Sequence, residues 1–128
     1  MSDDMMTIRQ MCDTYQVTPR ALRFYESREL LAPVRDGQKR LYTRRDRGRL
    51  VLILRGKRFG FSLEEIRQLL DLYEPGEGEA TQIARTVDLA RERLAMLERQ
   101  HAEIGQAVAD LREELARAEA MLPKSSAA

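Results

Sequence analysis

The fold of this chain is decided by residues 18–26, which read Thr-Pro-Arg-Ala-Leu-Arg-Phe-Tyr-Glu. Thr18 can accept a backbone N–H as the N-cap of a helix, and Pro19 suits the first helical position, where an N–H would have no partner. Leu22 and Tyr25 stand three residues apart, so they share one face of that helix. The stretch therefore predicts a short amphipathic helix that packs through this face.

The other side of the same helix is cationic. Arg20 and Arg23 lie on or beside the face opposite Leu22 and Tyr25, close to the first helical turn. Positive charge is unfavourable there, because the helix macrodipole already leaves partial positive charge at the N-terminus. An anionic partner outside the protein would resolve this conflict. We interpret that partner as double-stranded DNA, with its phosphate backbone and its groove.

The distribution of charge along the 128 residues also favours a polyanionic partner. The formal net charge is only +1. Residues 20–58, however, hold thirteen Lys and Arg residues and four Asp and Glu residues, whereas residues 74–128 hold seven basic and eleven acidic residues. An evenly solvated surface would not produce this split. The first half of the chain therefore has the charge expected of a nucleic-acid-binding module.

Composition argues against several other classes of protein. No apolar run approaches the roughly 20 residues of a membrane span, and no signal-peptide pattern is present, so we expect a cytoplasmic protein with no membrane partner. Cys12 is the only cysteine and His101 the only histidine. We therefore expect no internal disulfide, no metal site and no cofactor. No carboxylate pair or nucleophile–base set indicates an enzyme.

A shorter helix is predicted just before the one described above. Thr7 can cap it, and apolar residues recur after Thr7 at helical spacing. They are Ile8, Met11, Cys12 and Tyr15. Residues 16–17 connect the two helices so closely that they fit a helix-turn-helix. Cys12 is expected to pack as a small apolar residue rather than to act as a sensing thiol, and residues 1–6 to form a loose acidic tail.

A basic hairpin is predicted after the second helix. Residues 34–42 contain Asp36-Gly37, a strong turn signal, between short segments that end in β-forming residues. The cations of this hairpin are Arg35, Lys39 and Arg40. A solvated loop could be basic by chance. A protruding cationic ribbon directly after a recognition helix is more typical of a wing that contacts DNA.

Two further helices are predicted from their capping residues. Thr43 with Asp46 makes an approximate capping box, Gly60 suits the C-terminal turn of that helix, and Ser62 with Glu65 makes a full capping box. Both helices carry an apolar stripe. The stripe residues are Leu50, Ile53 and Leu54 in the first, and Ile66, Leu69, Leu70 and Tyr73 in the second.

The chain is predicted to divide where Pro-Gly-Glu-Gly, at residues 75–78, breaks the last of these helices. We expect a DNA-binding domain over residues 1–74, a linker over 75–80, a long helix over 81–122 and a flexible tail over 123–128.

The long helix carries an apolar seam that alternates steps of four and three residues without a slip, as in a coiled coil. The seam consists of Ile83, Val87, Ala90, Leu94, Leu97, His101, Ile104, Val108, Leu111, Leu115, Ala118 and Leu122. At 1.5 Å per residue, roughly 40 residues span about 60 Å, which the small first domain cannot cover. A partner helix is therefore required. His101, the polar member, is interpreted as a register device, the alternative being a pH- or ligand-responsive switch.

Taken together, these motifs resemble the MerR family of bacterial transcription regulators. The resemblance runs over residues 6–73. It is carried by residues 18–26, by Leu30-Leu31-Ala32-Pro33, by Arg40-Leu41-Tyr42, by Asp46 and by residues 60–66. It implies an all-α fold with a small β-hairpin wing. This is a winged helix-turn-helix, followed by a long dimerisation helix that pairs antiparallel with the same helix of a second subunit.

The resemblance also implies which residues meet DNA. The predicted set comprises Thr18, Arg20, Arg23, Phe24 and Tyr25 of the recognition helix, and Arg35, Lys39, Arg40 and Tyr42 of the wing. Phe24 replaces the Tyr that is commoner at its position, so a hydroxyl contact sometimes made there is absent. Tyr25 and Tyr42 each have an alternative interpretation as half-buried packing residues.

The function implied is transcription regulation by a homodimer on a two-fold symmetric operator. In the family such an operator lies in the promoter spacer, so RNA polymerase is affected indirectly, through distorted DNA. The features typical of metal- and drug-sensing members are absent, and the effector is not predicted. Residues 50–72 resemble regulators of branched-chain amino acid and fatty acid breakdown. The alternative function is a coiled-coil interaction protein whose basic module docks an acidic protein surface.

Overall fold

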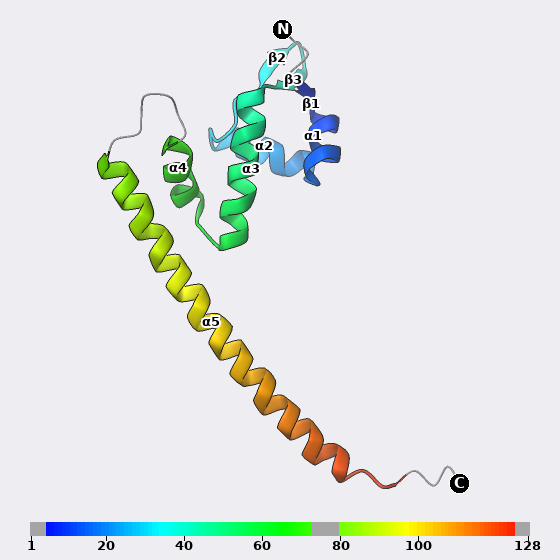
Figure 1. Cartoon of the computed structure of the whole chain (residues 1–128). Helices are drawn as coiled ribbons and strands as arrows, with labels where there is room; N and C mark the ends of the chain where they lie inside the picture. The colour runs from blue at the N-terminus through cyan, green and yellow to red at the C-terminus, as the bar shows by residue number, and fades with distance from the viewer. Residues whose placement is uncertain (1–4, 73–79, 125–128) are drawn as a thin grey trace. The chain divides into compact units, whose positions relative to one another are not determined.

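The computed structural model describes residues 5–72 and 80–124 (Figure 1). The chain divides into two units, residues 1–87 and 88–128, and each is described by itself. The elements are β1 Met6–Thr7, α1 Ile8–Tyr15, α2 Pro19–Ser27, β2 Val34–Asp36, β3 Lys39–Tyr42, α3 Arg44–Phe59, α4 Leu63–Leu72 and α5 Ala80–Ala120. A mostly helical chain with a small sheet confirms the predicted fold class.

Capping side chains begin the helices where the sequence predicts. The Thr18 hydroxyl accepts a hydrogen bond from the Ala21 N–H at 3.0 Å, and Pro19 occupies the first turn of α2. Capping boxes with both reciprocal bonds are formed by Thr7 and Gln10, by Thr43 and Asp46, and by Ser62 and Glu65. Gly60 ends α3 with a left-handed φ of 85°. These local signals fix the helix starts and the α3–α4 corner.

The predicted hairpin belongs, among the described residues, to a three-stranded antiparallel sheet in the order β1-β3-β2. Gly37 takes a left-handed φ of 64° in the turn between β2 and β3. On the other edge of β3, Met6 of β1 pairs with Tyr42. The predicted loose tail over residues 1–6 is therefore wrong at Met6, because the free edge of β3 has backbone groups that β1 satisfies. Residues 1–4 lie outside the described part of the chain.

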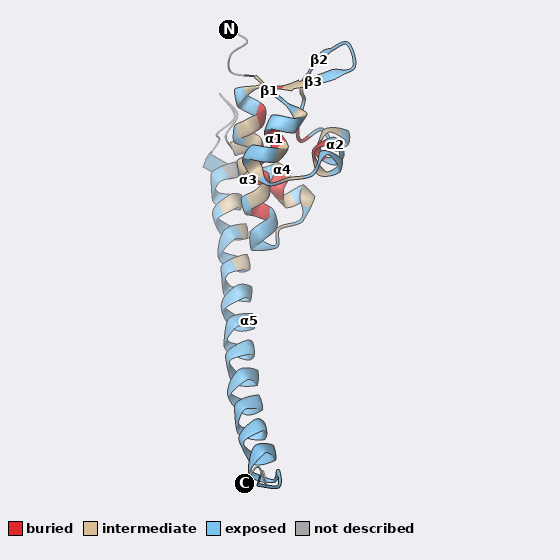
Figure 2. Ribbon diagram, turned by 90° about the vertical axis from the view of Figure 1, so that its right-hand side faces the viewer, coloured by how far each residue is buried: buried red, intermediate tan, exposed pale blue. Residues whose placement is uncertain are grey.

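The helices and the sheet of the first unit enclose an apolar core. Its buried members are Met11, Leu22, Tyr25, Leu30, Leu31, Tyr42, Leu50, Ile53, Ile66 and Leu70. In Figure 2 the buried segments lie on the inward sides of the helices, whereas the outer part of the β2–β3 hairpin is exposed. The predicted inward faces of α2, α3 and α4 are confirmed by these residues.

α5 is a continuous helix of 41 residues, and none of its described side chains is buried within this chain. It ends at Ala120, two residues before the predicted end at Leu122. The cause is Pro123, whose ring disfavours the helical conformation in the preceding residue. None of the described helices combines the length and the apolarity needed to cross a bilayer.

Part of the predicted layout falls on residues that the structure does not describe. The described residues do not include Tyr73, residues 75–79 of the predicted linker or residues 125–128 of the predicted tail. The last residue of the predicted linker, Ala80, already belongs to α5.

Candidate nucleic-acid interface

The outward face of α2 presents two arginines and an aromatic ring. Arg20, Arg23 and Phe24 are exposed, Phe24 at 42% of its surface. Within the described residues, neither arginine side chain forms a hydrogen bond or an ion pair. Thr18 is exposed at the start of the helix, where it acts as the cap. Both guanidinium groups are therefore free to bind an external anion.

Phe24 is flanked by a further cation. The Arg28 guanidinium lies 5.4 Å from the centroid of the Phe24 ring, within the range of a cation–π interaction. The Ser27 hydroxyl donates a hydrogen bond to the Phe24 carbonyl at 2.6 Å. The outward face of α2 therefore offers charge and one apolar ring, while the Ser27 hydroxyl hydrogen is used within the helix.

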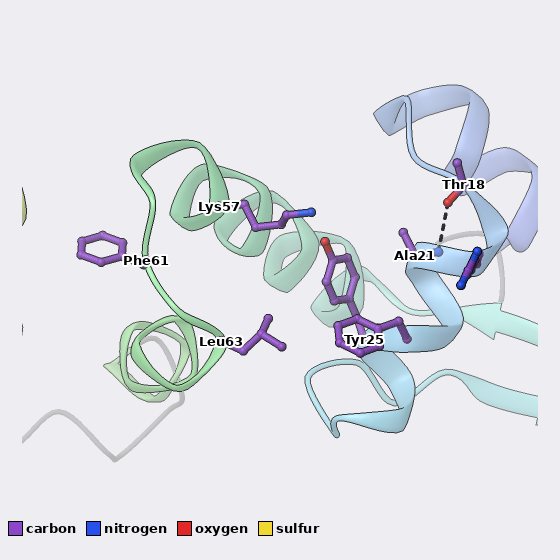
Figure 3. Close-up of a pocket in the computed structure, with 8 residues that line it drawn as sticks. Thr18, Ala21, Tyr25, Lys57, Phe61 and Leu63 are labelled. Atoms are coloured by element: carbon purple, nitrogen blue, oxygen red, sulfur yellow. Dashed lines mark hydrogen bonds between the residues drawn. The ribbon is translucent and has the colours of Figure 1, made fainter. Parts of the chain in front are cut away.

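Tyr25 points away from this outward face. It is buried in the core, with 2% of its surface exposed, and the Lys57 ammonium of α3 lies 5.9 Å from the centroid of its ring. Figure 3 shows the Tyr25 ring directed from α2 toward Lys57. The structure favours the packing interpretation of Tyr25 over the predicted phosphate contact, because a helix that buries Leu22 also buries the residue three positions later.

An open groove of about 470 Å³ separates the start of α2 from the α3–α4 corner (Figure 3). Its lining residues are Thr18, Arg20, Ala21, Phe24, Tyr25, Lys57, Phe61 and Leu63. Lys57 brings a second cation to the groove beside Arg20. Lys57 was not predicted to belong to the interface, because along the chain it is one of many cations of α3 and only the fold brings it close to α2.

The cations of the hairpin divide into two groups. Lys39 is exposed on β3. Arg35 and Arg40 instead converge on Glu26 of α2: Arg35 Nη2 lies 2.7 Å from Oε2, and Arg40 Nε lies 2.6 Å from Oε1. Both predicted wing arginines therefore already have an anionic partner inside the protein. No role of Glu26 could be predicted from the sequence, since its partners are nine and fourteen residues away.

The electrostatic state of Glu26 follows from these contacts. Burial of the carboxyl acts to raise its pKa, but the hydrogen bonds and positive charges of Arg40 and Arg35 outweigh that effect and hold the pKa below the ordinary value of 4.5. Glu26 is therefore a carboxylate at neutral pH, and the three side chains together carry one net positive charge.

Tyr42 lies at the base of the hairpin rather than at its tip. It is fully buried, and its hydroxyl has neither accessible surface nor a hydrogen-bond partner within the described residues. Burial raises the pKa of Tyr42 above its ordinary value of 10.0, against the opposing effect of the Arg40 charge. The burial of Tyr42 supports its alternative interpretation as a packing residue, because pairing with β1 places this end of β3 in the core.

Charged side chains also hold the connector between α2 and the hairpin. The buried Asp46 carboxylate accepts hydrogen bonds from the N–H groups of Ala32, at 3.0 Å, and Thr43, at 3.2 Å. Arg49 Nε donates to the Leu30 carbonyl at 2.7 Å. The structure thus gives Asp46 a second task beyond the predicted cap: it ties the connector to α3.

Metal ligands are not gathered in the part of the chain that the structure describes, where no group of three His, Cys, Asp or Glu side chains could hold an ion. Cys12 is half-buried and packs against the core.

Comparison with known proteins decides the family. The family model described as "MerR HTH family regulatory protein" matches residues 6–72, and the model described as "MerR, DNA binding" matches residues 47–121. The chain belongs to the MerR family. Like other members, it is a DNA-binding transcriptional regulator and not an enzyme. The family was identified correctly from the sequence.

Individual MerR-family proteins are similar over most of this chain. The transcriptional regulator ZntR of Escherichia coli K12 is 35% identical over 102 residues, which is 78% of this chain and 71% of ZntR. PbrR691 of Ralstonia metallidurans, solved in complex with lead(II), is 30% identical, covers 84% of this chain and 85% of its own, and has a TM-score of 0.61. HiNmlR, solved bound to promoter DNA, shares the fold at 24% identity and a TM-score of 0.69, with 88% of this chain and 84% of its own covered.

Proposed function

We propose that this MerR-family protein is a homodimer that binds a two-fold symmetric operator through α2 and the hairpin of each protomer. The observation that supports this proposal most strongly is the exposed seam of α5. Family members act as dimers on promoter DNA, which supports the proposal. The outward arginines of α2 supply charge of the sign that DNA requires.

The seam of α5 needs a partner of its own length. Large apolar side chains are exposed along the helix, from Ile83 to Leu115, with Ile104 at 63% and Leu111 at 67%. At 1.5 Å per residue the 41 residues of α5 span about 60 Å. A second copy of α5 carries a complementary seam of equal length. We infer that two copies pair through the predicted dimerisation residues, namely Ile83, Val87, Ala90, Leu94, Leu97, His101, Ile104, Val108, Leu111 and Leu115.

A dimer of this kind implies how the protein acts on a promoter. Two recognition helices related by a two-fold axis fit a two-fold symmetric operator whose half-sites occupy successive major grooves. In our proposal the operator lies in a promoter spacer that is too long for RNA polymerase, and the protein bends and untwists it. The deformation costs several kcal/mol, which contacts of the recognition helices and wings on both flanks must offset.

None of the comparisons supports the narrower prediction that the targets belong to branched-chain amino acid or fatty acid breakdown.

The dimer is tested with a seam variant and a matched control. Burying the side chains of Leu97 and Ile104 contributes about 1.5–3 kcal/mol each, so Leu97→Asp with Ile104→Asp should give monomers by light scattering and abolish specific DNA binding. Ala95→Asp with Ala102→Asp adds the same charge to the same helix outside the seam and should leave the dimer intact. A seam variant that stays dimeric would refute the pairing.

The distortion mechanism is tested with the promoter itself. Shortening the spacer by about two base pairs should make transcription high and independent of the protein, or repressed by it, because the polymerase elements are then aligned without bending. A native spacer of ordinary length would exclude this mechanism and favour repression by occlusion. If the protein binds no duplex with sequence preference, the interaction protein that docks an acidic surface becomes the better account.

A further inference from the structure

Glu26 joins the recognition helix to both strands of the hairpin. Arg35 of β2 and Arg40 of β3 are paired opposite each other in the sheet register. Each uses one oxygen of the same carboxylate, Arg35 at 2.7 Å and Arg40 at 2.6 Å. We call these three residues the Glu26 clasp. Because both carboxylate oxygens are engaged, the clasp restrains two strands at once with respect to α2.

The clasp restrains the outer part of the hairpin, which lies outside the buried core. Tyr42, at the end of β3, is buried, but every residue of β2 is exposed, and so is Lys39 at the start of β3. Figure 2 shows this outer part of the hairpin projecting beyond the helices of the first unit. Glu26 itself is partly sheltered, with 21% of its side chain exposed. The direction of the outer hairpin relative to α2 therefore depends on these charge-assisted hydrogen bonds.

A carboxylate at this place is otherwise unfavourable for a DNA-binding protein. It lies on the element that carries Arg20 and Arg23, and it neutralises one of two wing arginines that could each bind a phosphate. On charge alone, its removal should tighten binding to any DNA, since two arginines would be released toward the polyanion. If Glu26 instead holds the hairpin in place, its removal should weaken binding to the specific site.

We propose that Glu26 is a positioning residue for specific DNA binding, which sets the hairpin at the angle to the recognition helix that one operator half-site requires. In the protein without DNA, Arg35 and Arg40 connect the two strands of the hairpin to Glu26. The inference rests on the proposed use of α2 and the hairpin as the DNA-binding surface.

The test compares two charge-removing variants on two DNA probes. The probes are a duplex selected by the wild-type protein from a random library, and a scrambled duplex of the same base composition. Glu26→Gln removes the clasp. The control is Glu29→Gln, which removes a carboxylate from an exposed residue three positions on that forms no ion pair within the described residues. Affinities are measured at one salt concentration, and melting temperatures at one protein concentration.

We expect Glu26→Gln to bind the selected duplex about tenfold more weakly or worse, and the scrambled duplex equally or more tightly. Glu29→Gln should leave the ratio of the two affinities unchanged. Glu26→Asp, which keeps the charge, should recover part of the ratio. Hydrogen exchange should accelerate in residues 34–40 of Glu26→Gln and stay constant in α3, which separates a loosened hairpin from an unfolded domain.

The outcomes distinguish a failure of the proposed DNA-binding function from a failure of the role proposed for Glu26. If the wild-type protein selects no duplex, the proposed function fails before Glu26 is considered. If the wild type selects a duplex and Glu26→Gln binds it as tightly or more tightly, Glu26 does not position the hairpin and the inference is overturned. Equal weakening on both duplexes, together with a lowered melting temperature and faster hydrogen exchange in α3 as well, would also overturn it, in favour of a role in stability alone.

Discussion

A Cβ atom added to Gly56 of α3 would lie 2.6 Å from Cγ1 of Ile66 on α4. Both residues are buried, so the two helices approach each other through a point that only glycine leaves open. This close approach sets the α3–α4 corner, and with it the position of Lys57 and Phe61 beside the recognition helix.

Replacing Gly56 with Ala should therefore destabilise the protein by about 1–3 kcal/mol, because the overlap must be relieved by moving the buried Ile66. Gly48→Ala is the matched control on the same helix, where an added Cβ has nothing within 4 Å. It should raise stability by about 0.5–1 kcal/mol, since alanine loses less backbone entropy in a helix. Denaturant unfolding at one protein concentration measures both. Similar effects of the two substitutions would contradict the close packing.

Tyr42→Phe separates packing from phosphate contact. The buried hydroxyl of Tyr42 has no partner within the described residues, so its removal should leave DNA affinity unchanged and raise stability by about 1 kcal/mol. If the Tyr42 hydroxyl contacts phosphate, its removal would instead weaken binding to every duplex. Binding isotherms and unfolding curves of the same preparation decide between the two.

The buried hydroxyl also predicts a loss of stability in alkali. Burial raises the pKa of Tyr42, so the folded state keeps the proton at a pH where the unfolded chain has lost it. The stabilisation is complete below the ordinary tyrosine pKa of 10.0 and is lost as the pH rises above it. The free energy of unfolding should therefore fall more steeply above pH 10 in the wild type than in Tyr42→Phe. Parallel curves would show that Tyr42 ionises as easily in the folded protein.

Arg20 and Arg23 should affect DNA binding differently, although both are exposed cations of α2. If Arg23 binds phosphate, Arg23→Ala weakens binding to all duplexes. It also makes the negative slope of log K against log salt shallower by about 0.9 per subunit. Arg20→Ala should relax sequence preference at one position of each half-site. The control is Arg99→Ala, on α5 outside the seam, which should change neither quantity. A slope that Arg23→Ala leaves unaltered would exclude a phosphate contact.

The sequence predicted those parts of the fold that depend on neighbouring residues. Thr18 and Pro19 start α2 because the capping hydroxyl and the N–H that donates to it are only three residues apart, and Gly60 ends α3 for an equally local reason. The seam of α5 could be predicted from its period. The hairpin could be predicted from its Asp36-Gly37 turn, and the family resemblance added which residues are expected to meet DNA.

The features that the sequence did not reveal depend on partners far along the chain. Met6 joins the sheet because β3 has a second edge, and the same pairing buries Tyr42. Arg35 and Arg40 were predicted to contact DNA from the wing, and their ion pairs with Glu26 were not predicted. A capping pattern or a hydrophobic period carries no information on such contacts, so the geometry of the candidate site required the structure.

The mass of the protein–DNA complex tests most directly the claim that two chains read one symmetric operator. The wild-type protein is used to select duplexes from a random library. The mass of its complex with a selected duplex is then measured by analytical ultracentrifugation. We predict that the selected sites are two-fold symmetric, with half-site centres about one helical turn or a whole multiple of it apart, and that each duplex carries two chains. A selected site without symmetry, or one chain per duplex at saturation, would contradict the account.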